Sequence, residues 1–141
     1  LYILYIVINM KNLVKNLNLA SKYKNIGSVY NLINNYNDND WDKYMIKNPV
    51  AYQKTIISKD ENYELVLINW EKGSFTSLHN HPENGCVMKV LSGNLTEFYN
   101  NDTKTLVNND TNIRLKDDEH MILAKEKSYS LHYYSPPNYY N

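Results

Sequence analysis

The sequence has little cysteine and no excess of either charge. A single cysteine, Cys86, among 141 residues excludes an internal disulfide framework and a zinc ribbon, and it fits a reducing compartment. Fifteen basic residues balance fifteen acidic ones, so no net field attracts nucleic acid or an acidic membrane surface. We therefore expect a cytoplasmic protein without a nucleic-acid partner.

The sequence also has no apolar run long enough to cross a bilayer. The longest, Tyr2 to Ile8, is far shorter than the roughly 20 residues of a membrane-spanning helix, and no basic segment precedes it as in a signal peptide. A chain of 141 residues has room for one compact domain rather than two. We expect one soluble, monomeric domain over residues 1–141 without membrane contact, while Leu1 leaves the natural start open.

The first third of the chain has the three-to-four spacing of apolar residues that is typical of helices. The spaced residues are Leu13, Val14, Leu17, Val29, Leu32, Ile33, Tyr36, Trp41, Tyr44 and Met45. Ser28 is expected to cap the second helix, and the polar run 34–40 is expected to be a linker. The pattern predicts a helical cap over about residues 1–48.

From about Tyr52 the apolar period changes to two, which is typical of short strands. Strands are expected at 63–70, 86–91, 95–99, 113–115, 120–124 and 129–134. Turn sequences rich in Gly, Asn, Asp and Pro separate them, as in an antiparallel sandwich or small barrel. We predict a mainly β domain over about residues 50–141. Its last strand should end at Pro136-Pro137, because proline cannot donate a ladder hydrogen bond.

Two histidines, His79 and His81, give the strongest chemical signal. They are two apart in a predicted strand, so their rings should project from one face and reach one metal ion. The wider pattern is Gly73, five residues, His79, one residue, His81, four residues, Cys86, six residues, Gly93. This spacing resembles the first metal-binding motif of the cupin barrels, most of which carry a glutamate ligand in place of Cys86.

A cysteine at that position is a feature of the cysteine dioxygenases, and longer segments of the chain resemble that family. They are Trp70-Glu71-Lys72-Gly73, His79-Asn80-His81-Pro82, Gly85 to Leu95, and Ser130 to Pro137. Weaker similarity extends upstream through Trp41 and Tyr44. The resemblance therefore covers nearly the whole chain.

The resemblance implies a cupin-type antiparallel β-barrel with a short N-terminal helical region. It also implies Fe(II)-dependent oxidation of the thiol of L-cysteine by O2 to a sulfinic acid, 3-sulfinoalanine. In that family three histidines hold the iron, because neutral imidazoles bind Fe(II) and leave it electron-rich enough to activate O2. His79 and His81 match two of these three metal ligands.

The same resemblance assigns four catalytic residues. Cys86 and Tyr134 match the pair that the family can join by a thioether between sulfur and ring. Ser130 and His132 alternate with Tyr134 on one strand face and match the residues that orient its hydroxyl by hydrogen bonds. The structural alternatives are a buried free cysteine and a polar strand face without a catalytic task.

Two residues match substrate-binding positions, Lys54 and Tyr52. Lys54 stands where the family has an arginine that clamps the substrate carboxylate. Lysine keeps the charge but lacks the planar fork of paired N–H donors, so carboxylate recognition should be less directional. This departure leaves other small thiols open as substrates.

The third metal ligand is left open, because the chain is short by about one strand and turn between the two similar blocks. One alignment, which the local residue types favour, assigns 115–123 to the strand before that ligand and leaves no third histidine. The other places the gap before Glu119 and makes His120 the ligand. Without His120, a carboxylate such as Glu119 or Glu83 can complete the site, or these acids lie in solvated turns.

Three functions follow from these alternatives. The first is an iron-dependent thiol dioxygenase that acts on L-cysteine or another small thiol with O2. The second is a non-catalytic or metal-poor cupin remnant that works as a binding or structural module, which the deletion and Lys54 favour. The third is a cupin with different metal chemistry, such as isomerisation or hydrolysis, which the Cys86 and Tyr134 match disfavours.

Overall fold

The computed structural model describes residues 6–139, so most of the apolar run Tyr2 to Ile8 lies outside the described residues. Two α-helices come first, α1 (Met10–Ala20) and α2 (Ile26–Asn35), accompanied by the 3₁₀ helices η1 (Ser21–Tyr23) and η2 (Asp40–Tyr44). Eight strands follow: β1 (Tyr52–Lys59), β2 (Glu64–Trp70), β3 (Cys86–Ser92), β4 (Asn94–Tyr99), β5 (Asp102–Val107), β6 (Thr111–Arg114), β7 (His120–Ala124) and β8 (Ser128–Tyr134). Within residues 6–139, every helix is too short or too polar to span a bilayer.

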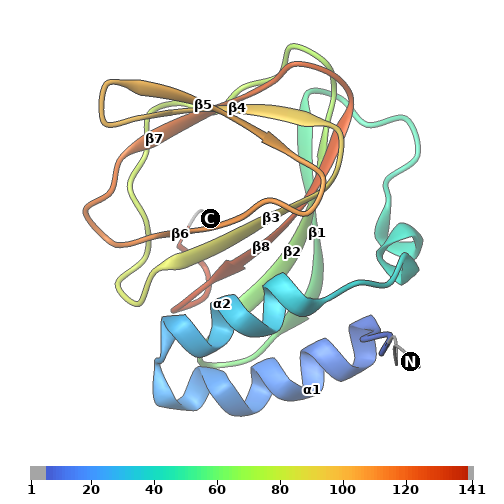
Figure 1. Ribbon diagram of the computed structural model, residues 1–141, viewed down its shortest axis with the longest axis vertical. Coiled ribbons are helices and arrows are strands. Elements are labelled where there is room, and N and C mark those ends of the chain that lie inside the picture. Colours follow the sequence, from blue (N-terminus) through green and yellow to red (C-terminus); the bar gives the residue numbers. More distant parts are fainter. Residues whose placement is uncertain (1–5, 140–141) are drawn as a thin grey trace, which may run out of the picture.

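Two antiparallel sheets face each other and enclose the interior of the domain (Figure 1). One sheet has the strand order β1-β2-β8-β3-β6, and the other has the order β5-β4-β7. Both helices lie beneath the five-stranded sheet, on the face that points away from the three-stranded sheet (Figure 1). The predicted mainly β architecture with a short N-terminal helical region is confirmed.

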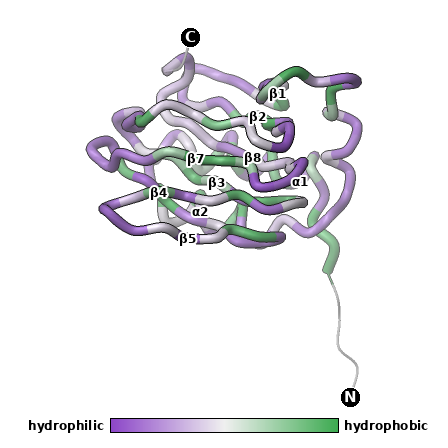
Figure 2. Tube along the Cα trace, turned by 90° about the horizontal axis from the view of Figure 1, so that it is seen from above, coloured by the Kyte–Doolittle hydropathy of each residue, from purple (hydrophilic) through white to green (hydrophobic). Residues whose placement is uncertain are grey.

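Alternation along the strands divides the buried side chains into two groups. Val66, Ile68 and Trp70 of β2 point between the two sheets and belong to the same core as Leu95 and Ile122 of the opposite sheet. The intervening strand positions instead pack against the helices; they are Leu65, Val87, Leu131 and Tyr133, which meet Leu13, Leu17, Val29 and Ile33. Hydrophobic stretches lie within β3 and β7 in Figure 2, whereas several of the turns are hydrophilic.

The residue that caps the second helix is Asn25 and not the predicted Ser28. Helix α2 begins at Ile26, and the side chain of Asn25 accepts a hydrogen bond from the backbone N–H of Ser28. A capping residue needs extended backbone, which Asn25 has (φ −94°, ψ 95°), whereas Ser28 lies inside the helix. The prediction of Ser28 was therefore wrong.

Two strands have no clear signal in the sequence. β1 is an edge strand with mostly exposed residues, and β5 begins at Asp102, inside a segment that the sequence marks as a turn. Only Leu106 of β5 is buried. Edge strands of this kind are defined by backbone pairing with a neighbour, so they lack strong hydrophobic alternation.

Candidate metal centre

A cavity of about 460 Å³ opens between the two sheets. Its lining includes seven of the eight residues to which the sequence gave a role; they are Tyr52, Lys54, His79, His81, Cys86, His132 and Tyr134. The eighth, Ser130, is fully buried behind His132 and contacts its ring. The fold thus gathers side chains from β1, β3, β8 and the segment between β2 and β3 around one space.

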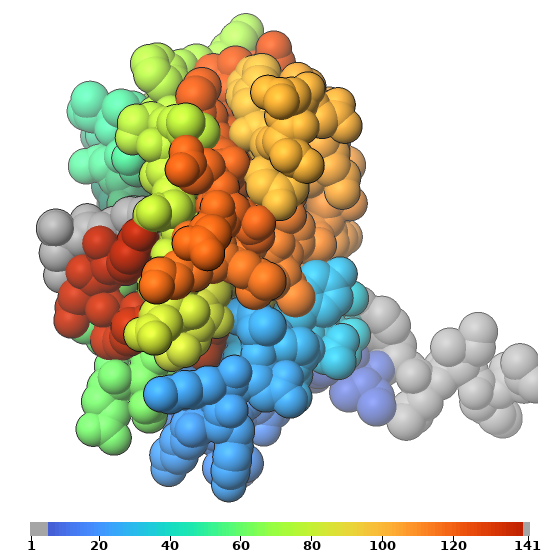
Figure 3. All heavy atoms as spheres, turned by 90° about the vertical axis from the view of Figure 1, so that its left-hand side faces the viewer, coloured from blue at the N-terminus to red at the C-terminus, as the bar shows by residue number. Residues whose placement is uncertain are grey.

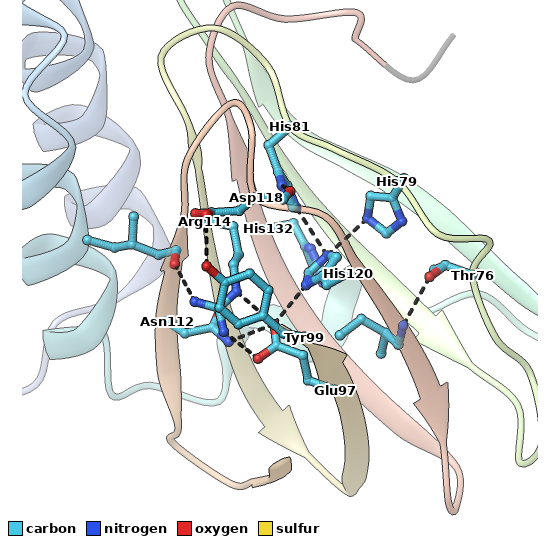
Figure 4. A network of polar contacts seen from close by, with 12 residues as sticks. Thr76, His79, His81, Glu97, Tyr99, Asn112, Arg114, Asp118, His120 and His132 are labelled. Carbon is cyan, nitrogen blue, oxygen red and sulfur yellow. Dashed lines mark hydrogen bonds and ion pairs between the residues drawn. The ribbon is translucent and has the colours of Figure 1, made fainter. Parts of the chain in front are cut away.

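Three histidine rings meet in this cavity, those of His79, His81 and His120. Their ligand atoms all lie within 4.8 Å of one another, and Figure 4 shows the rings turned toward each other. This is the arrangement of the alignment that makes His120 the third ligand, and not the one that local residue types favour.

The backbone around His79 and His81 is irregular rather than the strand that the sequence predicted. It connects to β7 through single antiparallel bridges, Phe75 to Leu123 and His79 to His120. His79 and His120 exchange both backbone hydrogen bonds, each at 3.0 Å. In Figure 3 this segment lies directly beside the one that leads into β7. The pairing places His120 next to His79, although 41 positions separate them in the chain.

Each of the three rings is oriented through its Nδ1 atom. Nδ1 of His79 lies 2.8 Å from the carbonyl oxygen of Ser77, and Nδ1 of His81 lies 2.7 Å from that of Asp118. Nδ1 of His120 lies 2.7 Å from the Glu97 carboxylate. These oxygens can only accept, so each Nδ1 carries a hydrogen and donates it. In a neutral ring Nε2 then has a lone pair and no hydrogen.

The Nε2 lone pairs fit a metal cation. Nε2 of His120 lies 3.0 Å from Nε2 of His81 and 3.0 Å from Nε2 of His79. Two nitrogens that bind one ion at about 2.1 Å in perpendicular directions lie about 3.0 Å apart. Burial is the main cause that lowers the pKa of His79, and it lowers that of His81 to about 4, so both rings are neutral at pH 7. Facing lone pairs repel unless a cation lies between them, so this donor set is suited to a divalent metal ion.

A buried acid, Glu97, supports the His120 ring. Its side chain is 1 % exposed, and it also accepts from Arg114, with Nε to Oε2 at 3.0 Å and Nη2 to Oε1 at 2.5 Å. Burial alone raises the pKa of Glu97, but the hydrogen bonds from His120 and Arg114 outweigh it and hold the pKa below its usual value. The Arg114 guanidinium lies over the Tyr99 ring, 4.0 Å from its centroid. Glu97 is therefore a carboxylate that fixes the orientation of one imidazole of the candidate metal site.

The expected carboxylate alternatives are not part of this cluster. Glu83 and Glu119 are both exposed, and the group that the described residues form consists of the three histidines. Glu97 was not singled out from the sequence, although a signal existed. Glu97 lies two positions after Leu95 in the predicted strand 95–99 and therefore shares its buried face. A charged residue on a buried face needs a partner.

A hydrogen-bonded chain runs along β8 beside the histidine cluster. Ser130 Oγ lies 2.7 Å from Nε2 of His132, and Nδ1 of His132 lies 3.2 Å from the Tyr134 hydroxyl. All three residues are at most 5 % exposed. Burial lowers the pKa of His132 well below its usual value, so this ring is neutral.

Cys86 and Tyr134 lie opposite each other on two neighbouring strands, β3 and β8. They are directly opposed Cα partners in the pairing of β3 with β8, and both are buried. Burial raises the pKa of the Cys86 thiol, so the residue is a neutral thiol in this site. The register brings together the two residues that the sequence paired.

Lys54 and Tyr52 enter the cavity from β1. Nζ of Lys54 lies 5.3 Å from the centroid of the Tyr134 ring, and burial lowers the pKa of this amine. The Tyr52 ring stacks on Trp70 with centroids 5.2 Å apart. One cationic side chain thus lies above the tyrosine that borders the histidine cluster.

Comparison with known proteins identifies the family. The sequence model described as cysteine dioxygenase type I matches residues 6–140, which is nearly the whole chain. The chain belongs to the cysteine dioxygenase type I family. Solved structures agree with the fold: an RmlC-like cupin from Shewanella frigidimarina superimposes with a TM-score of 0.60 at 16 % identity and covers 66 % of this chain and 83 % of its own. KdgF from Halomonas sp. superimposes with a TM-score of 0.60 at 17 % identity, covering 67 % and 86 %. The cupin fold is therefore confirmed.

Curated cysteine dioxygenases match part of this chain and are much longer than it is. Cysteine dioxygenase type 1 of Danio rerio is 28 % identical over 93 residues, which cover 62 % of this chain and 46 % of the fish protein. The protein of the same name from Rattus norvegicus is 26 % identical over 76 residues, covering 52 % and 38 %. The chain thus spans less than half the length of these cysteine dioxygenase relatives.

Proposed function

We propose that the chain is a thiol dioxygenase that uses Fe(II) and O2 to oxidise L-cysteine to 3-sulfinoalanine. The observation that carries this proposal is the convergence of His79, His81 and His120 in one cavity. The same cavity is also lined by the Lys54 side chain and by the buried Tyr134. Family membership supports the reaction class. All three candidate ligands are histidines, which also supports iron, since neutral imidazoles leave Fe(II) able to react with O2.

The three imidazoles would hold the iron through their Nε2 atoms. Bound Fe(II) supplies a site for the substrate thiolate and for the reduction of O2 that the reaction requires. Glu97 and the two backbone carbonyls keep the rings in the tautomer that leaves Nε2 without hydrogen. The protein thereby prepares the donor atoms before the metal arrives.

Lys54 would bind the substrate carboxylate. Its ammonium group is the cationic side chain that lines the cavity from β1, and it lies over the ring of Tyr134. An ion pair at this point fixes the orientation of an amino acid whose thiol is directed toward the histidines. The three N–H donors of a lysine ammonium rotate freely and form no planar fork, so this recognition is less directional than that of an arginine.

Tyr134 would place a hydroxyl beside the reacting groups. Its oxygen is held by His132, which is held in turn by Ser130, so the phenol has a fixed position in the cavity wall. A thioether between Cys86 Sγ and the Tyr134 ring would lock that position further; an S–C bond would replace the S–H bond and one ring C–H bond, with O2 as the two-electron oxidant that takes up the two hydrogens. Intact mass of the purified protein, with a Cys86→Ala variant as control, measures this deficit.

Direct measurement of sulfinate tests the proposal. Iron-loaded protein is incubated with L-cysteine and O2, and 3-sulfinoalanine is quantified against a His79→Ala control at saturating iron. The wild-type chain is expected to form product well above the control. No product above the control rejects the dioxygenase and favours a non-catalytic cupin, the rival that Lys54 and the deletion between the two similar blocks favour.

A further inference from the structure

The connection between β6 and β7 holds both the backbone and the ring of His81. It consists of residues 115–119 and crosses from the five-stranded sheet to the three-stranded sheet. The backbone N–H of His81 donates to the carbonyl oxygen of Lys116 at 3.2 Å, and Nδ1 of His81 donates to that of Asp118 at 2.7 Å. Because both bonds end on this connection, its position affects where the His81 ring lies.

The side chain of Asp118 closes the connection into a turn. Its Oδ2 accepts from the backbone N–H of Leu115 at 2.6 Å, and the backbone N–H of Asp118 donates to the carbonyl oxygen of Leu115 at 3.0 Å. These two bonds lie within the turn, so they fix its shape but do not attach it to the rest of the domain. The second carboxylate oxygen, Oδ1, can accept from another element.

Tyr99, the last residue of β4, attaches the turn to the three-stranded sheet. Its hydroxyl donates to Oδ1 of Asp118 at 2.8 Å. Apart from His81, Tyr99 is the residue of another element whose side chain hydrogen-bonds to 115–119, among residues 6–139. Figure 4 shows Asp118 between His81 and Tyr99. Asp118 therefore binds Tyr99 with its carboxylate and orients His81 with its carbonyl oxygen.

We propose that Asp118 and Tyr99 are positioning residues for His81: the Tyr99 hydroxyl holds the Asp118 carboxylate and thereby fixes the carbonyl that orients the imidazole. Connections move more readily than strands, so a carbonyl in a turn is a precise acceptor only when the turn is attached. The role parallels that of Glu97 toward His120, where the carboxylate contacts the ring directly. This role rests on the metal site of the proposed function, and not on the oxidation of a thiol.

Metal affinity tests the proposal in the full chain. Co²⁺ is titrated in competition with a chromophoric chelator, which measures binding without turnover. Asp118→Ala should lower the affinity about tenfold, and Tyr99→Phe, which changes no charge, should lower it about threefold. Asp117→Ala is the matched control, because it removes the same charge from the same turn but its side chain is exposed. The affinity of this control should stay close to that of the wild type.

The double variant shows whether Tyr99 acts through Asp118. If it does, adding Tyr99→Phe to Asp118→Ala should cause no further loss of affinity. Losses that multiply in the double variant would overturn the proposal, and so would wild-type affinity in Asp118→Ala. If Asp118→Ala does not fold, Asp118→Asn serves in its place, because an amide keeps one oxygen acceptor and loses the other.

Hydrogen exchange of the imidazole N–H groups separates positioning from a general loss of stability. In Zn²⁺-loaded Tyr99→Phe, the Nδ1–H of His81 should exchange with water about tenfold faster than in the wild type, while that of His120 keeps its rate. Phenylalanine retains the ring against which the Arg114 guanidinium packs, so the support of His120 by Glu97 is unaltered. Equal acceleration at both histidines would show general loosening and would contradict the role of Tyr99.

Failure of the metal site and failure of the proposed function give different results. Wild-type protein that binds no Co²⁺ would reject the metal site and the positioning role together. Wild-type protein that binds Co²⁺ but forms no sulfinate with iron would reject the proposed function alone. In that case the affinities of the variants would still decide the role of Asp118 and Tyr99.

Discussion

Lys54 stands where the cysteine dioxygenases that the sequence resembles have an arginine. The guanidinium of an arginine binds both carboxylate oxygens, whereas an ammonium group binds as a point charge. Lys54 lines the cavity and is exposed as a residue, while its amine is partly shielded from water, so an arginine has room there. The residue is therefore the simplest place to test substrate choice.

We predict that Lys54→Arg strengthens the use of L-cysteine. The planar pair of parallel N–H donors in arginine should lower the apparent KM about threefold to tenfold, which corresponds to roughly 1 kcal/mol. Steady-state sulfinate formation over a range of cysteine concentrations measures it, with Lys104→Arg on β5 as the matched control. An equal or higher KM would show that Lys54 does not bind the carboxylate.

Glu97 gives a second prediction at the residue scale. Glu97→Gln keeps the shape but removes the negative charge that His120 and Arg114 share, so metal affinity should fall about tenfold to a hundredfold. Competition with a chromophoric chelator measures the affinity. Glu64→Gln is the control, because Glu64 is also a buried acid but accepts from the backbone of Asn138. Similar affinities in both variants would contradict the role of Glu97.

At the scale of elements, a buried lysine joins α2 to the five-stranded sheet. Lys89 of β3 is 2 % exposed, and its ammonium group donates to the carbonyl oxygens of Ile33, Asn34 and Tyr36 at the end of α2. They lie in the last turn and at the C-cap of the helix, where no following helical N–H groups are available, and that of Ile33 also accepts from the backbone N–H of Tyr36. Lys89 points to the helix side because it alternates with the cavity-facing positions of β3.

The pH dependence of stability should reveal this lysine. Burial lowers the pKa of Lys89 from 10.5 to about 8. Between these values the unfolded chain binds a proton that the folded chain does not, so the free energy of unfolding should rise with pH across this window. Relative to Lys89→Met, wild type should gain on the order of 1–3 kcal/mol from pH 8 to 10.5 in urea unfolding. Equal pH slopes in the two proteins would refute this, and Lys104→Met controls for the loss of one charge.

The turn between β3 and β4 provides a steric prediction. Gly93 has a φ of +110°, and a Cβ at this position would lie 2.2 Å from Ser128 Oγ and 2.7 Å from Ser128 Cα. Gly93→Ala should therefore destabilise the domain by about 1–3 kcal/mol more than Gly73→Ala. Gly73 has a φ of +86° but nothing within 4 Å of the added carbon, so it separates backbone strain from the clash. Similar losses in urea unfolding would mean that Ser128 moves aside.

At the scale of the whole molecule, the histidine cluster connects the two sheets. His120 belongs to β7 of the three-stranded sheet, while His79 and His81 lie on the segment that joins β2 to β3 of the other sheet. A ligand that binds only the folded chain stabilises it by mass action. Metal binding should therefore be measurable as stability of the whole domain.

We predict that Fe(II) at about a hundred times its Kd raises the free energy of unfolding by about 2.7 kcal/mol under anaerobic conditions. Chemical unfolding with and without Fe(II), and after addition of a chelator, measures the gain. His79→Ala should show a much smaller gain, because one of the three donors is missing. The same gain in wild type and variant would place iron elsewhere in the chain.

The local sequence by itself determined much of this protein. Period-two alternation located β2, β3, β4, β7 and β8 to within one or two residues, since one face of each strand is buried. The short spacing of His79, His81 and Cys86, and of His132 and Tyr134, likewise identified side chains that line one cavity, with Ser130 buried behind His132.

Only the tertiary structure decided which distant residues meet. His120 joins the cluster because β7 pairs with the His79 segment, and no local pattern fixes the register of a shortened strand. The contacts of Glu97 with His120 and of Trp70 with Ser130 span 23 and 60 positions. Such contacts depend on which strands become neighbours in a sheet and in which register, which is a property of the folded chain as a whole.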